Sequence, residues 1–153
     1  MNVEEILEMW KKDSKIDEVD LDLTSSETPK LHSKYLELYT ISKLKLKRLR
    51  LKISELKKDK WLYYTGKMTK EDMDDRGWEY DPFKGGTKPL KGDMDYYYDA
   101  DPDIQILVGK IEYQETLVET LEEIMNVIRW RHSTIKNIID WRRRFNFNLD
   151  IVY

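Results

Sequence analysis

The chain of 153 residues contains no cysteine, which excludes disulfide bonds and thiol chemistry. Its only histidines, His32 and His132, lie a hundred residues apart, so a zinc site of ordinary ligand spacing is not available. No apolar run approaches 18 residues, and we expect no membrane-spanning segment and no membrane partner. The absence of cysteine agrees with a reducing cytoplasm as the setting.

Motifs for a catalytic centre or a cofactor are also missing. An acidic run beginning at Asp99 resembles the start of a calcium loop, but Ile104 stands where the loop needs glycine and Lys110 where it needs glutamate. Gly85 and Gly86 lack the spacing of a phosphate-binding loop. We therefore expect no enzyme activity, no metal ion and no cofactor.

Charge is abundant and unevenly distributed. The net charge is −3, yet residues 31–70 carry +9, while residues 1–30 carry −5 and residues 71–103 carry −7. The segment from Lys43 to Lys60 holds nine basic and two acidic residues and must repel itself unless an anion neutralises it. Two kinds of anion fit: the acidic segments of the same chain, or a nucleic acid.

An aromatic run, Trp61-Leu62-Tyr63-Tyr64, follows the basic segment and ends at Gly66. Basic side chains beside aromatic surfaces suit single-stranded nucleic acid, whose bases stack while its phosphates are neutralised. Packing in a core or an interface is the alternative for these aromatic residues. The candidate DNA contacts are Lys57, Lys58, Lys60, Arg50, Lys52, Lys67 and Tyr64.

Apolar spacing predicts an all-α protein with two long helices, over residues 30–64 and about 103–145, and a short helix over residues 3–12. Alternating Lys and Leu at 43–47 would also fit a strand, but the alternation slips at Lys47-Arg48 and the composition favours a helix. Each long helix carries a coiled-coil-like seam. The first seam is Tyr35, Tyr39, Ser42, Leu46, Leu49, Ile53, Leu56, Lys60 and Tyr63; the second is Ile104, Leu107, Ile111, Gln114, Val118, Leu121, Met125, Ile128, His132, Ile135, Ile139 and Arg142.

Between the long helices, residues 65–102 hold five of the six glycines and three of the four prolines. This composition predicts a long acidic, aromatic loop. The acidic stretch from Asp13 to Pro29 is expected to be irregular, either laid along a partner surface or disordered.

A second apolar row beside the second seam (Leu117, Ile124, Arg131, Ile138, Phe145) predicts that this helix contacts more than one other helix. Since the chain offers one other long helix, we expect homo-oligomerisation to complete the core. We interpret 1–153 as a single domain with a basic DNA-binding part (1–70), an acidic loop (65–102) and an oligomerisation helix (103–147). The expected oligomerisation residues are Leu117, Val118, Leu121, Ile124, Met125, Ile128, Ile135, Ile138 and Ile139.

Four stretches share their order with one known family: Lys11-Lys12-Asp13 followed by Ile16-Asp17, Leu31-His32-Ser33-Lys34-Tyr35-Leu36, Leu56 to Gly66, and Ile135 to Arg142. Together they resemble the UvsY family of phage recombination mediators. The basic segment that closes on Tyr63-Tyr64-Thr65-Gly66 is the strongest match.

The resemblance implies an all-helical protein that forms rings of six or seven subunits in the host cell cytoplasm. Such a protein binds single-stranded DNA and helps a RecA-like recombinase to replace the single-strand-binding protein. By position, Lys58 and Lys60 would contact DNA, and the C-terminal helix would drive oligomerisation. The loop 65–102 and the tail after Phe145 look longer than is usual for the family, and Asp59 interrupts the basic segment. The alternative is an oligomeric helical scaffold or virion structural protein without DNA-binding activity.

Overall fold

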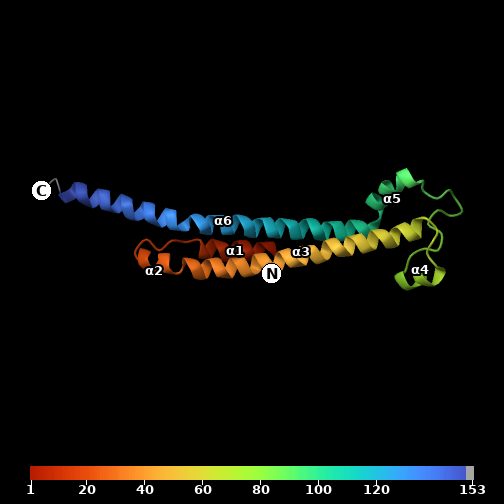
Figure 1. Cartoon of the computed structure of the whole chain (residues 1–153), viewed down its shortest axis with the longest axis horizontal. Coiled ribbons are helices and arrows are strands. Elements are labelled where there is room, and N and C mark those ends of the chain that lie inside the picture. Colours follow the sequence, from red (N-terminus) through yellow and green to blue (C-terminus); the bar gives the residue numbers. More distant parts are fainter. Residues whose placement is uncertain (151–153) are drawn as a thin grey trace. The chain divides into compact units, whose positions relative to one another are not determined.

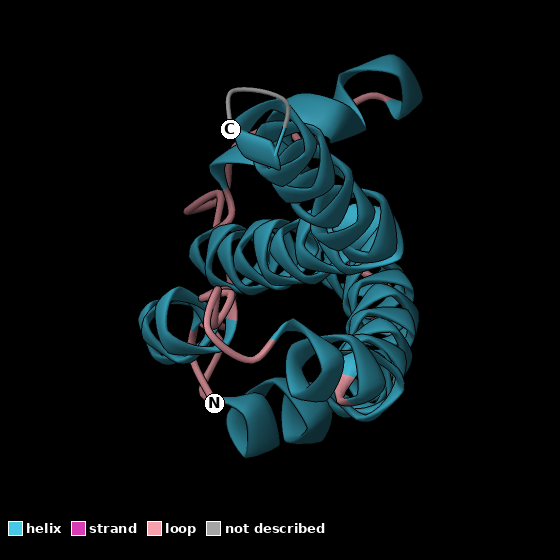
Figure 2. Ribbon diagram, turned by 90° about the vertical axis from the view of Figure 1, so that its left-hand side faces the viewer, coloured by secondary structure: helices cyan, strands magenta, loops and turns pink. Residues whose placement is uncertain are grey.

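The computed structural model describes the backbone of residues 1–150 and the side chains of residues 1–146. The last three residues of the predicted domain 1–153 therefore lie outside the described residues. Throughout the described range all regular structure is helical, as Figure 2 shows. The predicted all-α class is confirmed.

Contacts divide the chain into two compact units. The terminal unit consists of Met1–Lys43 and Glu115–Tyr153, and the central unit consists of Leu44–Gln114. Two long helices, α3 (Thr28–Tyr64) and α6 (Pro102–Asp150), each contribute to both units (Figure 1).

In the terminal unit, α1 (Val3–Asp13) begins at a capping box. Asn2 Oδ1 accepts from the backbone N–H of Glu5 at 2.8 Å, and the Glu5 carboxylate accepts from the backbone N–H of Asn2 at 2.9 Å. Two N–H groups that the helix leaves without partners are thereby satisfied. The helix presents Ile6 to the core of the unit, where this side chain is fully buried.

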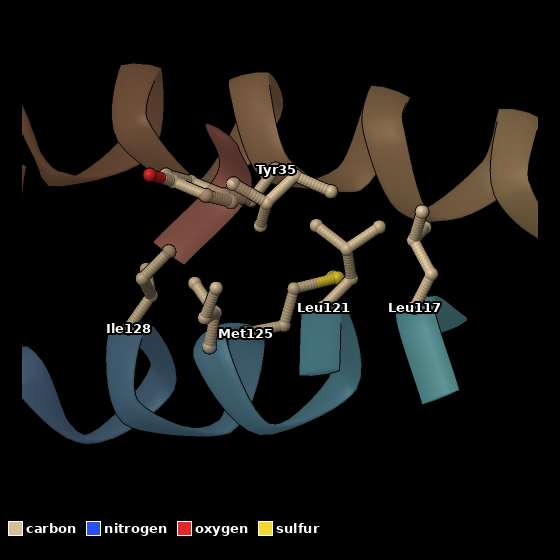
Figure 3. Packing of buried hydrophobic residues seen from close by; sticks show 7 residues of the cluster. Tyr35, Leu117, Leu121, Met125 and Ile128 are labelled. Atoms are coloured by element: carbon tan, nitrogen blue, oxygen red, sulfur yellow. The ribbon is translucent and has the colours of Figure 1, made fainter. Parts of the chain in front are cut away.

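The core of the terminal unit brings α1, α3 and α6 together (Figure 3). Tyr35 of α3 is completely buried, and its ring and that of Trp10 form a T-shaped pair with a centroid distance of 5.4 Å. Because α1 supplies a second helix against α6, the two apolar rows of α6 do not by themselves require another subunit. The buried cluster is Ile6, Tyr35, Leu117, Leu121, Ile124, Met125 and Ile128.

The stretch between α1 and α3 is more ordered than we predicted. It contains α2 (Leu21–Ser26), which begins where Asp20 accepts from the backbone N–H of Leu23 at 3.0 Å. Two arginines of α6 hold the segment before α2. Arg131 donates to the backbone carbonyls of Ser14 and Lys15 at 3.1 and 3.0 Å, and Arg142 donates to that of Glu18 at 2.6 Å. The sequence offered no sign of these contacts, which join residues more than a hundred positions apart.

Arg131 also corrects the predicted seam of α6. The seam placed His132 on the inner face, but His132 is exposed and its Nδ1 lies 2.8 Å from the carbonyl oxygen of Arg129. Arg131, which the predicted second row included, is buried. At this level α6 faces the backbone that follows α1, and the guanidinium donates to its carbonyls.

At its N-terminus, α6 begins with Pro102. The first position of a helix favours proline, because the backbone N–H that proline lacks would have no partner within the helix there.

In the central unit, the predicted loop 65–102 contains two short helices and a 3₁₀ turn. Helix α4 spans Lys70–Arg76, the turn η1 spans Lys91–Asp93, and α5 spans Met94–Ala100. The prediction of one long loop was therefore wrong in detail. Thr69 begins α4 by accepting from the backbone N–H of Asp72 at 3.2 Å, a local cap that we did not weigh against the glycines and prolines.

Candidate nucleic-acid interface

An exposed basic stripe runs along α3 within the central unit. Its members are Lys47, Arg50, Ser54, Lys57 and Trp61, and alternating steps of three and four residues place them on one face of the helix. All five side chains are exposed, and Lys58 is exposed beside them. At 1.5 Å per residue the stripe is about 21 Å long.

Three exposed lysines in this part of α3 are not neutralised by the described carboxylates. No described carboxylate forms an ion pair with Lys52, Lys57 or Lys58. Asp59, which interrupts the basic segment in the sequence, pairs with Arg76 of α4. The acidic segments therefore leave these three ammonium groups available to an external anion.

Lys60 differs from these lysines because it is buried. Only 3% of its surface is exposed, and its Nζ lies 2.9 Å from Asp101 Oδ2 and 2.8 Å from Asp103 Oδ2. The ammonium also lies 3.9 Å from the centre of the Trp78 ring, while the indole N–H of Trp78 donates to Asp103 at 3.0 Å. In this structure Lys60 is enclosed by its own chain and presents no charge to a phosphate.

Asp101 is the hub of this buried cluster. One carboxylate oxygen accepts from Lys60 and from the Tyr64 hydroxyl at 2.6 Å, and the other accepts from the backbone N–H of Ile104 at 3.0 Å, capping α6. Burial by itself would raise the pKa of Asp101. The hydrogen bonds from Tyr64, Ile104 and Lys60, with the charge of Lys60, outweigh burial and hold its pKa below the usual value. The carboxylate is therefore charged at neutral pH.

Tyr63 and Tyr64 anchor the loop segment onto the end of α3. The Tyr63 hydroxyl donates to the carbonyl of Glu79 at 2.8 Å, and its ring meets Trp78 at a centroid distance of 5.1 Å. Tyr64 meets Phe83 and Tyr97 at 6.0 and 5.6 Å. Burial, followed by the hydrogen bond to Asp101, raises the pKa of Tyr64. Both rings have aromatic partners inside the unit, and Tyr64 is partly buried. A base that stacked on Tyr64 would therefore compete with Phe83 and Tyr97.

Trp61 is the exposed aromatic residue at the end of the stripe. Its surface is 38% exposed, and the Lys67 ammonium lies 4.2 Å from its ring centre. The α3 terminus explains this pair. Gly66, with a left-handed φ of 72°, reverses the chain; its N–H bonds the Tyr63 carbonyl at 3.3 Å, and the N–H of Lys67 bonds the Leu62 carbonyl at 2.9 Å.

The predicted DNA contacts thus fall into two groups. Arg50, Lys52, Lys57, Lys58 and Lys67 are exposed, whereas Lys60 and Tyr64 belong to the buried cluster around Asp101. We did not select Trp61 and Lys47, which share the stripe. The spacing 47, 50, 54, 57 and 61 was a signal in the sequence that would have found both.

The predicted oligomerisation residues lie in the terminal unit and are mostly used within the chain. Those from Leu117 to Ile128, with Ile135, are buried, and Ile138 and Ile139 are half-buried. A different set on α6 is exposed: Val127, Trp130, Trp141 and Phe145.

Two kinds of site are not found in the part of the chain that the structure describes. No cluster of three or more acidic or histidine side chains is arranged to hold a metal ion. No helix there is both long and apolar enough to cross a membrane.

Comparisons with known proteins bear on the family and the fold of the chain. Residues 9–147 match the family described as "Recombination, repair and ssDNA binding protein UvsY". A comparison with curated proteins gave no match. A crystal structure of the bacteriophage T4 recombination mediator protein UvsY (lattice type II) has a TM-score of 0.80 at 24% sequence identity, covering 95% of this chain and 98% of that chain. A second T4 structure (lattice type I) has a TM-score of 0.78 at 23% identity, covering 91% and 97%. The fold is thus shared with these structures and the family match spans nearly the whole chain, so the protein belongs to the UvsY family of phage recombination mediators and single-stranded-DNA-binding proteins.

Proposed function

We propose that this protein binds single-stranded DNA, without sequence preference, along the exposed basic stripe of α3. The observation that carries the proposal is a set of exposed lysines that no described carboxylate neutralises: Lys57 on the stripe, and Lys52 and Lys58 on other faces of the same part of α3. Lysine contacts to phosphate carry no base information, which supports binding that is nearly independent of sequence.

The mediator role follows as the second part of the proposal. On DNA coated by the single-strand-binding protein, this protein loads a RecA-like recombinase in place of that coat, in the host cell cytoplasm during phage recombination and repair. Its family membership supports this role. The finding that the acidic segments form no described ion pair with Lys52, Lys57 or Lys58, while Asp101 and Asp103 hold Lys60, supports an external polyanion as the partner of these three lysines.

Homo-oligomerisation into a ring of six or seven subunits completes the proposal. Four to six phosphate contacts on one chain give weak, salt-sensitive binding. A ring repeats the stripe, so that simultaneous contacts give tight binding. Exposed apolar side chains of α6 support assembly: Val127, Trp130, Trp141 and Phe145, with the exposed Thr134 and the half-buried Ile138 between them, repeat every three or four residues on one face. We assign the subunit contact to this face, in place of the seam residues that the terminal unit buries.

Fluorescence anisotropy of a labelled single-stranded oligonucleotide across a salt series tests DNA binding. For the Lys57→Ala/Lys58→Ala double variant we expect weaker binding and a slope of log K against log salt that is reduced by about 1.4, since each phosphate contact on a single strand contributes about 0.7. Lys110→Ala, an exposed lysine on α6 of the same unit, is the matched control and should leave the slope unchanged. A folded, oligomeric protein that does not bind at low salt would favour the scaffold alternative.

The mediator step has its own test, which uses DNA coated with the single-strand-binding protein. We expect the protein to shorten the lag before the DNA-dependent ATPase activity of a RecA-like recombinase appears. The double variant should leave the lag long. An equally short lag with the double variant would contradict a role for the stripe in loading.

A further inference from the structure

Proteins that bind single-stranded DNA contact its bases as well as its phosphates, usually by stacking a base on an aromatic side chain. The stripe accounts for phosphate contacts, which leaves open the side chain on which a base would stack. The inference below rests on the proposed function and deepens it. Nine aromatic residues lie at the end of α3 or in the segment 65–102 that follows it, so the choice depends on which rings are open and lie on the stripe.

Most of these rings are engaged inside the central unit. Tyr63 packs on Trp78, and Tyr64 packs on Phe83 and Tyr97. The hydroxyls of Tyr63 and Tyr64 are also committed, to Glu79 and Asp101. A base that stacked on either ring would have to compete with these contacts.

Trp61 has an open ring and lies on the same face of α3 as the basic stripe. It continues the stripe at the position four residues after Lys57 and seven after Ser54, so it lies on the face that carries the exposed cations. It is exposed, and no described ring packs on it; the Lys67 ammonium lies over the indole ring. Indole offers the largest stacking surface of the side chains here, and tolerates any base because every base has a π-face.

Lys67 adds a positive charge beside the Trp61 ring. The left-handed turn at Gly66 directs the chain back over the last turn of α3, which places the ammonium 4.2 Å from the indole centre. The cation restrains the ring in a cation–π contact and stands next to where the phosphate of a stacked nucleotide must pass. Lys57 and Lys58 lie about one helical turn before Trp61, whereas Lys67 follows it in the chain. The stripe therefore ends in an aromatic ring with cations both before and after it.

We propose that Trp61 is the stacking platform for a base of single-stranded DNA, and that Lys57, Lys58 and Lys67 hold the phosphates on either side of it. This arrangement gives each subunit one base contact at the end of its basic stripe. Binding stays independent of sequence, because stacking reads no hydrogen-bonding edge, but it requires that bases be present.

The test compares a thymine oligonucleotide of about 10 bases with an abasic strand of the same length and charge. For the wild type we expect tighter binding of the thymine strand, and for Trp61→Leu we expect that preference to shrink by about 5-fold or more. The salt slope of Trp61→Leu should match the wild type, because no phosphate contact is lost. Trp61→Phe should retain part of the preference, which separates stacking from a general effect on folding.

Tyr80→Leu is the matched control. Tyr80 is an exposed ring of the same unit with the Lys70 ammonium 5.5 Å from its centre, but it does not belong to the stripe. Its loss should leave the preference unchanged. If wild type and Trp61→Leu bind with the same preference for bases, the stacking inference fails while the proposed DNA binding stands. If the wild type does not bind either strand at low salt, both fail.

Discussion

Two lysines that stand two positions apart on α3, Lys58 and Lys60, have opposite environments. Two residues correspond to about 200° around a helix, so one side chain faces solvent when the other faces the interior. Lys58 is exposed and has no ion pair among the described residues, whereas Lys60 is enclosed by Asp101, Asp103 and Trp78. Similarity of residue type along a basic segment therefore does not imply a shared role.

For Lys60→Ala we expect a loss of stability, not the loss of a phosphate contact. Removing one partner of a buried ion pair leaves Asp101 charged and uncompensated, which typically costs about 3–5 kcal/mol. Urea unfolding measures the loss, and Lys58→Ala should unfold like the wild type. A Lys60→Ala protein of unchanged stability whose salt slope for DNA falls by about 0.7 would show instead that Lys60 contacts phosphate.

Asp101 makes the stability of the central unit dependent on pH. Because its folded pKa lies below the unfolded value of about 3.9, the stabilisation is fully present above that value and is lost as pH falls through the folded pKa. We expect urea unfolding midpoints to drop below about pH 4 in the wild type. Asp101→Asn should be less stable at pH 7 and should show a smaller drop. An identical pH dependence in both proteins would contradict the role of Asp101 as a buried, charged hub.

At the scale of elements, two left-handed glycines position the side chains around the end of α3. Gly66 ends α3 and precedes Lys67, and Gly77 ends α4 and precedes Trp78. At both ends the N–H of the residue after the glycine bonds a carbonyl five residues earlier, in Leu62 and Met73 respectively. Each glycine is followed by one side chain that packs at the end of α3: Lys67 lies over Trp61, and Trp78, which follows α4, lies against Lys60 of α3.

Gly66→Ala should disrupt this arrangement. A Cβ at φ 72° is strained by about 1–2 kcal/mol and would also collide with the Lys88 ammonium, a flexible group that can move aside. We expect a lower thermal midpoint and weaker binding of single-stranded DNA, since Lys67 would leave Trp61. Gly92→Ala is the control, because Gly92 has no atoms near the position of a Cβ and no left-handed φ. Equal stability and DNA affinity for Gly66→Ala and wild type would rule out the proposed role of this turn.

The elements of this fold were largely readable from the sequence, and the contacts between distant residues were not. Apolar spacing predicted α1, α3 and α6, because helix periodicity is a local property. Two conflicting predictions for Lys60 came from the sequence: the seam of α3 placed it on the inner face, whereas the family resemblance made it a DNA contact. In the structure Lys60 is buried, as the seam predicted. The spacing could not identify the partners of Lys60, because Asp101 and Asp103 lie some forty residues later and no local pattern pairs them with it. The bonds from Arg131 to Ser14 and Lys15 escaped prediction for the same reason.

At the scale of the whole molecule, the basic stripe and the exposed face of α6 belong to different compact units. The stripe lies in the central unit, and Val127, Trp130, Trp141 and Phe145 lie in the terminal unit. Substitutions in one are therefore expected to leave the local structure of the other intact. This separation allows assembly and DNA contact to be tested independently.

The Trp130→Arg/Trp141→Arg double variant should weaken assembly without unfolding the chain, because both indoles are 69% exposed and fill no described core. Charge on an apolar face that meets its own copy disfavours association, since desolvated like charges repel. Sedimentation velocity measures the change in mass, and Tyr96→Arg, a substitution of an exposed ring in the central unit, is the control.

The same Trp130→Arg/Trp141→Arg variant separates the affinity of one stripe for DNA from the gain that comes from several linked subunits. On a strand short enough to contact one stripe, its affinity and salt slope should match the wild type, because Lys57, Lys58 and Trp61 are untouched. On a strand long enough to reach several subunits, its affinity should fall by about 100-fold, which is the order of gain expected from linked sites. A smaller species that still binds the long strand as tightly as the wild type would mean that one stripe suffices, and that assembly serves recombinase loading instead of DNA affinity.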